Sequence, residues 1–222
     1  MDDLFEQLGV DVVAHGCAAD RAFVEALMIE ERRAVERAVD LRRHEFAGGR
    51  ACAHASLAVL ECGRTPILAS PDRSPVWPVG TVGSITHSDG FCLAAVSTQS
   101  DVSIGVDAEA VGRVTDEVAE VTMSSSERRW IAASAHPETM ATVVFTTKEA
   151  LYKAQHPVTG SWLDFVDVEV SQTPDADVLR IDLIEDVPEV RRLSWPVGSC
   201  WTVIEPSPGQ RLVVAAVVVR TD

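Results

Sequence analysis

Residues 103–109 read S-I-G-V-D-A-E, and the rest of the chain is best understood from this segment. It begins as an apolar run with β-branched residues, which favours a strand, and it ends in two carboxylates, Asp107 and Glu109. In an extended strand residues i and i+2 point to the same face, so both carboxylates face the same way. Their Cα atoms would lie about 6.5–7 Å apart, a separation that one small hard cation can bridge. A strand that simply ends in solvated acids is the alternative.

A second charged cluster follows at residues 145–154, F-T-T-K-E-A-L-Y-K-A, which has the composition of a helix. Glu149 and Lys153 stand at i and i+4, and Lys148 and Tyr152 repeat that spacing on an adjoining face. Such pairs are common on solvent-exposed helices, but the apolar neighbours here indicate a helix that faces the core. A carboxylate beside two ammonium groups suits Mg²⁺ and a polyanion such as a diphosphate. Glu149 would either ligate the metal or take a proton from an attacking hydroxyl.

Length and composition bound the class of protein. At 222 residues, with 46% hydrophobic and 24% charged residues, the chain is long enough for one domain or two small halves. The first ten residues are acidic where a secretory signal would be basic, so no signal is expected. The longest apolar run, residues 212–219, is far shorter than the roughly twenty residues of a membrane span. We therefore expect a cytoplasmic protein with no membrane partner.

Charge and cysteine content argue against several functions. The formal net charge of −15 argues against nucleic acid as a partner, because a phosphate backbone needs a cationic surface. The five cysteines are odd in number and form no C-x-x-C pair, so we expect small buried thiols rather than zinc ligands or disulfides. Six arginines cluster between Arg32 and Arg50. Their interleaved acids indicate a solvated helix face, with a local anion site as the alternative.

Local patterns predict alternating blocks of helices and strands, an α+β architecture with mostly antiparallel sheets. Helices are expected at residues 19–45, 51–60, 124–135 and 140–155. Gly48-Gly49 is expected to interrupt or bend the helical region, and prolines keep residues 65–82 out of regular structure. A strand at 91–97 is expected to form a hairpin with 102–106.

From residue 162 onward apolar and polar residues alternate, which predicts an antiparallel sheet in the last part of the chain. A faint internal repeat also links the two halves of the sequence, because a phenylalanine is followed at +4 and +8 by polar residues in each. The two sets are Phe46, Arg50 and His54, and Phe145, Glu149 and Lys153. We therefore expect two related α+β halves, at residues 1–106 and 107–222.

Residues 83–90 carry a weaker signal. They are rich in small residues around one imidazole, His87, a composition suited to cradling a phosphate. A plain loop with an exposed histidine explains the pattern equally well.

Three of these segments resemble the signature motifs of the 4′-phosphopantetheinyl transferases. The motifs are V-G-S-I-T-H-S at 82–88, G-V-D-A-E at 105–109 and F-T-T-K-E-A-L-Y-K-A at 145–154. The likeness continues through R-R-H-E-F-A-G-G-R at 42–50 and S-W-L-D-F at 161–165, so it covers most of the interval between them in order. It is closest to the bacterial subgroup of this chain length that serves siderophore, polyketide and nonribosomal peptide synthesis.

The resemblance implies two similar α+β halves related by a pseudo-twofold axis, with coenzyme A bound in the cleft between them. It implies an enzyme that transfers 4′-phosphopantetheine from coenzyme A to a serine of an acyl or peptidyl carrier protein and releases adenosine 3′,5′-bisphosphate. The metal would be Mg²⁺, with Mn²⁺ as a second candidate, and a monomer is expected.

Roles for individual residues also follow from the resemblance. The metal would lie against Asp107, Glu109, Glu149 and the carbonyl of Ala108. Catalytic groups would be Glu149, as ligand or base, together with Lys153, Asp107 and His87. Contacts to coenzyme A would come from Arg42, Arg50, Arg73, Thr86, His87, Asp107, Lys148, Glu149, Lys153 and Trp162. Within this set, Arg42 and Arg50 would meet the 3′-phosphate and adenine, and Trp162 the pantetheine arm.

The chain departs from the family pattern in the proline-rich loop, and two other functions remain as alternatives. Ala69 stands where the family usually offers a lysine to the coenzyme, which leaves Arg73 as the nearest basic substitute. A Mg²⁺-dependent phosphodiester hydrolase could use the same carboxylates, and a non-catalytic binding module could keep the same fold. Against the binding module, a non-catalytic relative has no physical need to retain the buried charges of the set Asp107, Glu109, Glu149 and Lys153.

Overall fold

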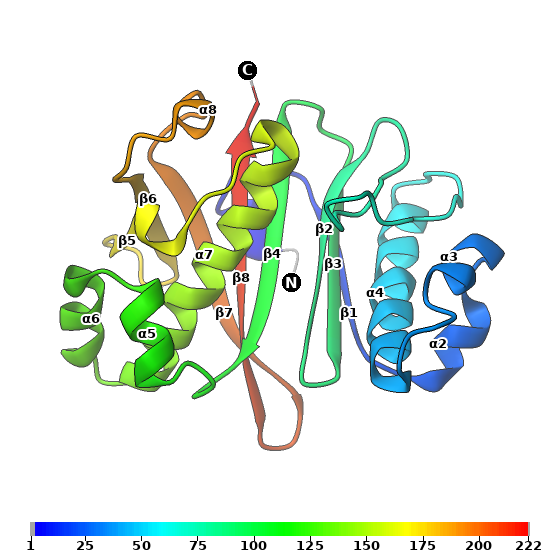
Figure 1. Cartoon of the computed structure of the whole chain (residues 1–222), viewed down its shortest axis with the longest axis horizontal. Helices are drawn as coiled ribbons and strands as arrows, with labels where there is room; N and C mark the ends of the chain where they lie inside the picture. The colour runs from blue at the N-terminus through cyan, green and yellow to red at the C-terminus, as the bar shows by residue number, and fades with distance from the viewer. Residues whose placement is uncertain (1–2, 222) are drawn as a thin grey trace.

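The computed structural model describes residues 3–221 and shows two halves side by side, each with a long helix packed against an antiparallel sheet (Figure 1). The three strands of the N-terminal half, in the sheet order β1-β3-β2, are β1 (Val13–Ala18), β3 (Phe91–Ser97) and β2 (Val82–Ser88). The helices of this half are α1 (Asp3–Glu6), α2 (Arg21–Ala26), α3 (Ile29–Ala34) and α4 (Asp40–Val59).

The C-terminal half holds a larger sheet, in the order β4-β8-β7-β6-β5, in which all neighbouring strands are antiparallel. Its strands are β4 (Val102–Ala110), β5 (Val168–Gln172), β6 (Val178–Leu183), β7 (Val197–Ser207) and β8 (Gln210–Arg220). Its helices are α5 (Asp116–Thr122), α6 (Ser125–Ala132), α7 (Pro137–Thr159) and α8 (Pro188–Arg191), with a 3₁₀ turn at Phe165–Asp167. The expected α+β class with antiparallel sheets is confirmed.

A single helix, α4, replaces the two helices expected around Gly48-Gly49. Both glycines face the small sheet, where a side chain would collide with it. A Cβ on Gly48 would lie 2.7 Å from Sγ of Cys92, and one on Gly49 would lie 2.7 Å from Cγ2 of Ile85. The glycines therefore bring α4 close to the sheet instead of breaking it. The region upstream, expected as one helix, is divided into α2, α3 and the first turns of α4.

The expected hairpin between β3 and β4 is wrong. β3 forms its hairpin with β2, through Asp89 and Gly90, whose φ angles are 47° and 77°. Two consecutive residues at positive φ are what a two-residue type I′ hairpin turn requires. β4 pairs along its whole length with β8, from the other end of the chain. No local pattern could indicate a partner so distant in sequence.

The helices α6 and α7 follow their local signals more closely. Ser124 accepts the N–H of Glu127, and the carboxylate of Glu127 accepts the N–H of Ser124 in return, so α6 begins at a capping box. α7 ends at Gly160, which has a left-handed φ of 66°. Pro157, expected to stop this helix, lies inside its last turns.

The two sheets meet along β2 and β4, which run in the same direction without sharing a backbone ladder. Three hydroxyl side chains of β2 bridge to β4 instead. The pairs are Ser84 with the N–H of Val106, Thr86 with the carboxylate of Asp107, and Ser88 with that of Glu109. The domain boundary expected between residues 106 and 107 falls inside β4, so a division into two domains stays a prediction.

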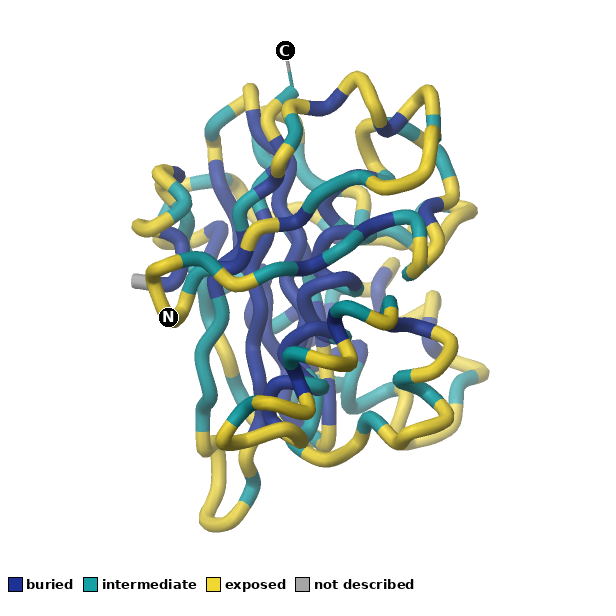
Figure 2. Tube along the Cα trace, turned by 90° about the vertical axis from the view of Figure 1, so that its left-hand side faces the viewer, coloured by how far each residue is buried: buried dark blue, intermediate teal, exposed yellow. Residues whose placement is uncertain are grey.

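Buried strands fill the interior, and exposed residues concentrate in the loops (Figure 2). One apolar core lies between α7 and the five-stranded sheet, and another lies between α4 and the small sheet. A third core, behind β4 and β8, includes Leu93 of β3 and so ties the halves together. Among the helices of residues 3–221, none combines the length and the apolar composition of a membrane crossing.

Candidate functional site

β4 presents its two acids on the face that α7 covers. Gly105, Asp107 and Glu109 share this face, whereas the alternate residues belong to the apolar core behind the sheet. The close approach of α7 depends on Gly105, because an added Cβ would lie 1.8 Å from the carbonyl oxygen of Ala150. The glycine of the G-V-D-A-E motif therefore brings the helix backbone against the strand beside the first acid.

Asp107 is buried and shares one carboxylate oxygen between two donors. Its Oδ1 accepts from Oγ1 of Thr86 at 2.8 Å and from Nζ of Lys153 at 2.6 Å. Lys153 also donates to the carbonyl of Val106 at 3.2 Å. The second oxygen of Asp107, Oδ2, is buried and has no hydrogen-bond partner among the described residues. A buried carboxylate oxygen without a donor is a natural ligand position for a cation.

Glu109 and Glu149 lie within electrostatic reach of Asp107. Burial, and then the charge of Asp107, raise the pKa of Glu109. Burial and then Asp107 also raise the pKa of Glu149, against an opposing effect of Lys153. Within residues 3–221, however, no three His, Cys, Asp or Glu side chains are already gathered as a metal cluster. The charged group that contacts Asp107 is the ammonium of Lys153, not another carboxylate.

A cavity of about 380 Å³ lies between the halves, next to these acids. One wall comes from the proline-rich loop and β2, and the other comes from the later turns of α7. Of the residues expected to contact coenzyme A, Arg73, Glu149 and Lys153 line it. Tyr152 and His156 line it as well, although sequence reasoning did not assign them to the site. Their +3 and +7 spacing from Glu149 was the available signal.

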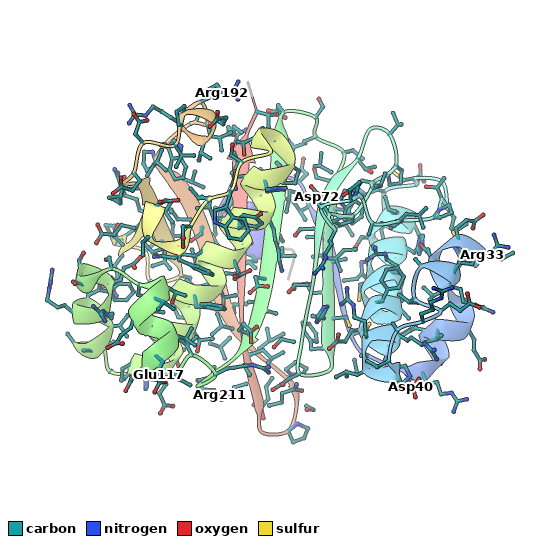
Figure 3. The ribbon with its side chains drawn as sticks, in the orientation of Figure 1. Arg33, Asp40, Asp72, Glu117, Arg192 and Arg211 are labelled. Atoms are coloured by element: carbon teal, nitrogen blue, oxygen red, sulfur yellow. The ribbon has the colours of Figure 1, made fainter. Side chains whose placement is uncertain are left out.

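A compact turn at residues 70–74 holds the loop wall of this cavity. Asp72 accepts hydrogen bonds from the hydroxyls of Ser70 and Ser74 and from the N–H of Ser74. These hydrogen bonds lower the pKa of Asp72 to about 2, and the bond from Ser70 has the largest effect. From the opposite wall, Nδ1 of His156 lies 3.4 Å from Oδ2 of Asp72. Figure 3 labels Asp72 beside the gap between the halves.

His87 and Arg42 form a second polar pair, between β2 and the start of α4. Nη1 of Arg42 lies 2.8 Å from Nε2 of His87, and Oε2 of Glu45 lies 3.7 Å from its Nδ1. Burial lowers the pKa of His87, and the charges of Arg42 and Lys153 lower it further against an opposing effect of Glu45. A neutral imidazole accepting from Arg42 agrees with that direction. Two of the expected phosphate contacts are thus brought together.

Arg50 takes a different position from the one expected. It is buried over the ring of Phe46, with 4.1 Å between its guanidinium carbon and the ring centroid, and its Nε donates to the carbonyl of Ile67 at 2.8 Å. Burial lowers the pKa of Arg50 to about 10. Glu31 accepts the N–H of the same Ile67 at 2.9 Å. In the structure Arg50 therefore anchors the start of the proline-rich loop and does not line the cavity.

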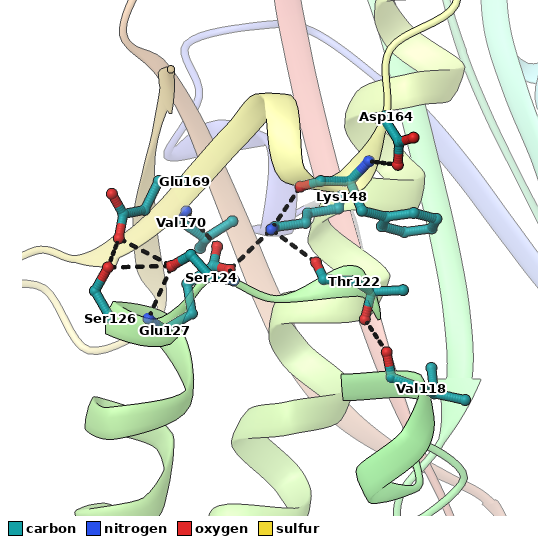
Figure 4. Close-up of polar contacts among 10 residues, drawn as sticks. Val118, Thr122, Ser124, Ser126, Glu127, Lys148, Asp164, Glu169 and Val170 are labelled. Carbon is teal, nitrogen blue, oxygen red and sulfur yellow. Dashed lines mark hydrogen bonds and ion pairs between the residues drawn. The ribbon is translucent and has the colours of Figure 1, made fainter. Parts of the chain in front are cut away.

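Lys148 also differs from its expected role, because its ammonium group lies in the interior of the C-terminal half (Figure 4). Nζ donates to Oε2 of Glu127 at 2.8 Å and to the carbonyls of Thr122 at 2.9 Å and Phe165 at 2.8 Å. An ammonium has three N–H groups, so none remains for a phosphate. Burial lowers the pKa of Lys148. The sequence pattern grouped Lys148 with Lys153, but five helical residues correspond to a rotation of about 140°, so the two side chains leave the helix on different faces.

Glu127 and Glu31 occupy comparable places in the two halves. Each is fully buried in the first turn of a short helix and accepts a backbone N–H from a later segment. Each also contacts a side chain of the long helix, Lys148 at 2.8 Å for Glu127 and His54 at 2.8 Å for Glu31. Burial opposes the ionised form of Glu31, but the His54 and backbone hydrogen bonds outweigh it and lower its pKa. This repetition supports the expected similarity of the halves.

A smaller cavity of about 130 Å³ adjoins the first and is lined by Trp162, Tyr152 and Glu149, among others. Trp162 is 74% exposed and meets Tyr152 edge-on, with 5.4 Å between the ring centroids. Because Glu149 and Tyr152 line both cavities, the expected pantetheine contact Trp162 lies a short distance from the main cleft.

The donor set around Asp107 fits Mg²⁺. The buried, unpartnered Oδ2 of Asp107 and the carboxylate of Glu109 lie on one face of β4. The carbonyl of Val106 accepts a hydrogen bond from Lys153. Because carbonyls two residues apart in a strand point to the same edge of that strand, the carbonyl of Ala108 points to this edge of β4 as well. Carboxylate and carbonyl oxygens are the ligands that a hard cation prefers.

Fold and site together describe an enzyme of the α+β class with a polar, carboxylate-bearing cleft between two halves. Two family models match the chain: the 4′-phosphopantetheinyl transferase N-terminal domain matches residues 30–97, and the 4′-phosphopantetheinyl transferase superfamily matches residues 103–198. The chain is 40% identical to 4′-phosphopantetheinyl transferase Svp of Streptomyces mobaraensis over 202 residues, which are 88% of this chain and 80% of that relative.

A further relative and a solved structure are also similar to this chain. 4′-Phosphopantetheinyl transferase PptT of Mycobacterium tuberculosis is 36% identical over 152 residues, 66% of this chain and 66% of the relative. The crystal structure of Thermotoga maritima holo-[acyl-carrier-protein] synthase has a TM-score of 0.41 and 20% identity, over 54% of this chain and 63% of that chain. The chain belongs to the 4′-phosphopantetheinyl transferase family, which confirms the resemblance carried by the three motifs.

Proposed function

We propose that this enzyme transfers 4′-phosphopantetheine from coenzyme A to a serine of an acyl or peptidyl carrier protein and releases adenosine 3′,5′-bisphosphate. The main support is the cavity of about 380 Å³ between the halves, which brings Arg73, Glu149 and Lys153 to one space beside Asp107. Membership of the transferase family supports the same reaction. Carrier domains of siderophore, polyketide and nonribosomal peptide synthesis are the candidate acceptors.

Glu149 and Lys153 would act at the reacting atoms. Burial and Asp107 raise the pKa of Glu149, which suits a group that takes the proton of the carrier serine as its oxygen bonds to phosphorus. The bond from that phosphorus to the oxygen of the second phosphate then breaks. Lys153, with its ammonium beside Asp107, would stabilise the charge on the departing phosphate.

Asp107 and Glu109, with the carbonyl of Ala108, are the groups that would hold Mg²⁺ or Mn²⁺, and Glu149 would complete this set as a ligand if it does not serve as the base. When bound, the ion would neutralise part of the diphosphate charge. Thr86 would orient Asp107 through the 2.8 Å bond to its Oδ1, which leaves Oδ2 as the free ligand atom.

The remaining contacts to coenzyme A would come from both walls of the cleft. Arg42 and His87, paired at 2.8 Å, would meet phosphate on the side of the N-terminal half, and Arg73 would do so from the proline-rich loop. Trp162 would flank the pantetheine arm at the smaller cavity. Lys148 would support the site without touching the substrate, because its three N–H groups all donate within the protein. Arg50 donates through Nε to Ile67, and the rest of its guanidinium would meet phosphate beside Arg42.

Mass spectrometry of a panel of apo-carrier proteins tests the proposal. The enzyme is incubated with coenzyme A, Mg²⁺ and each carrier, and a carrier whose mass grows by one phosphopantetheine group is the expected result. The same incubation without any carrier should leave coenzyme A intact. Equally fast release of free phosphopantetheine without an acceptor would indicate the hydrolase instead, an alternative that the relatives do not support.

A further inference from the structure

Two thiols of the N-terminal half lie unusually close together. Sγ of Cys17, on β1, is 3.2 Å from Sγ of Cys52, on the inner face of α4, and both cysteines are free. A disulfide requires about 2.05 Å between the two sulfurs, so a shift of roughly an ångström would join them. The pair connects segments that are far apart in sequence but packed against each other.

A third thiol, that of Cys92, completes the surroundings of this pair. Cys92 lies directly opposite Cys17 in the β1–β3 register, and its Sγ is 3.5 Å from the carbonyl of Glu45 on α4. Sγ of Cys52 lies 3.6 Å from the carbonyl of Cys92. Cys52 and Cys92 are buried, whereas Cys17 is only half-buried and so is the member of the group that a small solute can reach.

The electrostatics of the two neighbouring thiols differ. The hydrogen bond from Cys52 lowers the pKa of Cys17, and this outweighs the opposing effect of burial. That same hydrogen bond and burial raise the pKa of Cys52. A half-buried thiol with a lowered pKa, 3.2 Å from a buried thiol with a raised pKa, has the arrangement of an attacking sulfur and a resolving sulfur.

We propose that Cys17 and Cys52 form an oxidisable dithiol that closes to an intramolecular disulfide when a hydroperoxide is present. The Cys17 sulfur takes the terminal oxygen of the peroxide and becomes a sulfenic acid, while the rest of the peroxide leaves as an alcohol or, for hydrogen peroxide, as water. The Cys52 sulfur then bonds to that of Cys17 and expels the oxygen as water. The two thiols lose two electrons and two protons in all, and the peroxide is reduced.

The disulfide would tie β1 to α4 and so close a loop that contains α2 and α3. Cross-linking a loop of this length restricts the unfolded chain, so the oxidised enzyme should melt roughly 5–10 °C higher than the reduced enzyme. Cys92 lies opposite Cys17 in the β1–β3 pairing and opposite His87 in the β2–β3 pairing. The disulfide would therefore lie on the same face of the small sheet as the contact between Arg42 and His87.

The test uses the reduced enzyme, which is treated with equimolar hydrogen peroxide, then denatured and treated with an alkylating reagent, because Cys52, Cys92 and Cys200 are buried in the folded protein. We expect the number of alkylated cysteines to fall from five to three, and peptide mapping to find residues 17 and 52 joined. Dithiothreitol should restore all five. Five alkylated cysteines after treatment, or a disulfide between another pair, would overturn the proposal.

Two matched variants distinguish a specific disulfide between Cys17 and Cys52 from general oxidation of accessible thiols. Cys62→Ser removes a half-buried thiol whose nearest polar partner is the carbonyl of Leu60, and this variant should still form the disulfide. Cys17→Ser should leave Cys52 reduced and alkylatable after denaturation, and should abolish the peroxide-dependent rise in melting temperature. A rise of the same size in Cys17→Ser would contradict the assignment, and the mapping of the unmutated enzyme stands whether or not this variant folds.

Discussion

At the scale of single residues, Asp107 connects both walls of the site. It accepts from Thr86 on β2 and from Lys153 on α7, and it is itself part of β4. It is also first among the charges that raise the pKa values of Glu109 and Glu149. One buried carboxylate therefore sets the position of a lysine and the proton affinity of two acids.

Replacement of Asp107 by asparagine tests this role. Asp107→Asn keeps the shape and the acceptor for Thr86 but removes the charge that faces Lys153 and the proposed ion. We expect carrier loading, followed by mass spectrometry, to slow by about 10²-fold or more. Asp177→Asn, at an exposed position in the turn between β5 and β6, is the matched control and should load carriers at the normal rate. Near-normal loading by Asp107→Asn would remove Asp107 from the mechanism.

Glu149 offers a prediction with opposite signs for stability and activity. Its pKa is raised in the folded protein, so the folded state binds this proton more readily than the unfolded chain does. Stability therefore falls as the pH rises through the raised pKa, and the cost persists at neutral pH. Glu149→Gln removes that cost and should melt at a higher temperature at pH 7, while turnover falls about 10²–10⁴-fold.

Thermal melts of Glu149→Gln across a pH series check the sign. Below the ordinary pKa of a glutamate the two proteins should melt alike, because the carboxyl group is then protonated in both states. A glutamine variant that melts lower than the parent at neutral pH would show that ionised Glu149 stabilises the fold.

At the scale of elements, the contact between α7 and β4 depends on one missing side chain. A Cβ at Gly105 would lie 1.8 Å from the carbonyl oxygen of Ala150, which belongs to the helix backbone and cannot rotate away. Gly105→Ala should therefore lower the free energy of unfolding in urea by about 1–3 kcal/mol and displace Lys153 from Asp107. Gly198→Ala, in the same sheet with its nearest neighbour at 3.7 Å, is the control. Equal losses in both variants would count against a helix–strand collision.

The network around Lys148 provides a test of its structural role. Lys148→Met leaves Glu127 charged and buried without its partner, which should cost about 3–5 kcal/mol of unfolding free energy. Adding Glu127→Gln removes that charge and keeps an acceptor for the backbone, so the double variant should recover much of the stability. It should also recover turnover, because no substrate contact has been lost. A stable but inactive double variant would return Lys148 to the substrate site.

The sequence predicted the elements that carry local signals and failed where contacts are distant. α6 begins at Ser125, capped by Ser124, in agreement with the helix expected from residue 124, whereas α7 continues to Thr159, beyond its expected end at residue 155. The dipeptide Asp89-Gly90 is a turn signal that favours the observed β2–β3 hairpin over the expected hairpin between residues 91–97 and 102–106. Pairing of β4 with β8, and the continuity of α4 through its glycines, depend on partners that only the folded chain brings together.

At the scale of the whole molecule, the cleft predicts where coenzyme A leaves a footprint. Hydrogen exchange with and without coenzyme A and Mg²⁺ should show slower exchange at residues 72–85 and 149–157, which form the two walls. A larger cavity of about 540 Å³ lies between α5, α6 and the start of α7, and there exchange should not change. Protection at that second cavity alone would place the coenzyme outside the cleft.

The candidate site was partly predictable for a physical reason. Asp107 and Glu109 follow from the two-residue period of a strand, and Glu149 and Lys153 from the four-residue period of a helix. These spacings do not predict which face of a helix turns toward the cleft once the helix has packed. Lys148 turned out to face the interior, and the wall residues Tyr152 and His156 were missed.

The junction between β2 and β4 has a mechanical consequence. Two strands joined by backbone hydrogen bonds separate only when many of these bonds break together. Between β2 and β4, only side-chain hydroxyls form such bridges, and each hydrogen bond contributes about 1 kcal/mol. Behind these contacts, the apolar core that includes residues of both sheets holds the two halves together. A small rotation of one half against the other would therefore break only these hydroxyl contacts and leave every strand ladder intact.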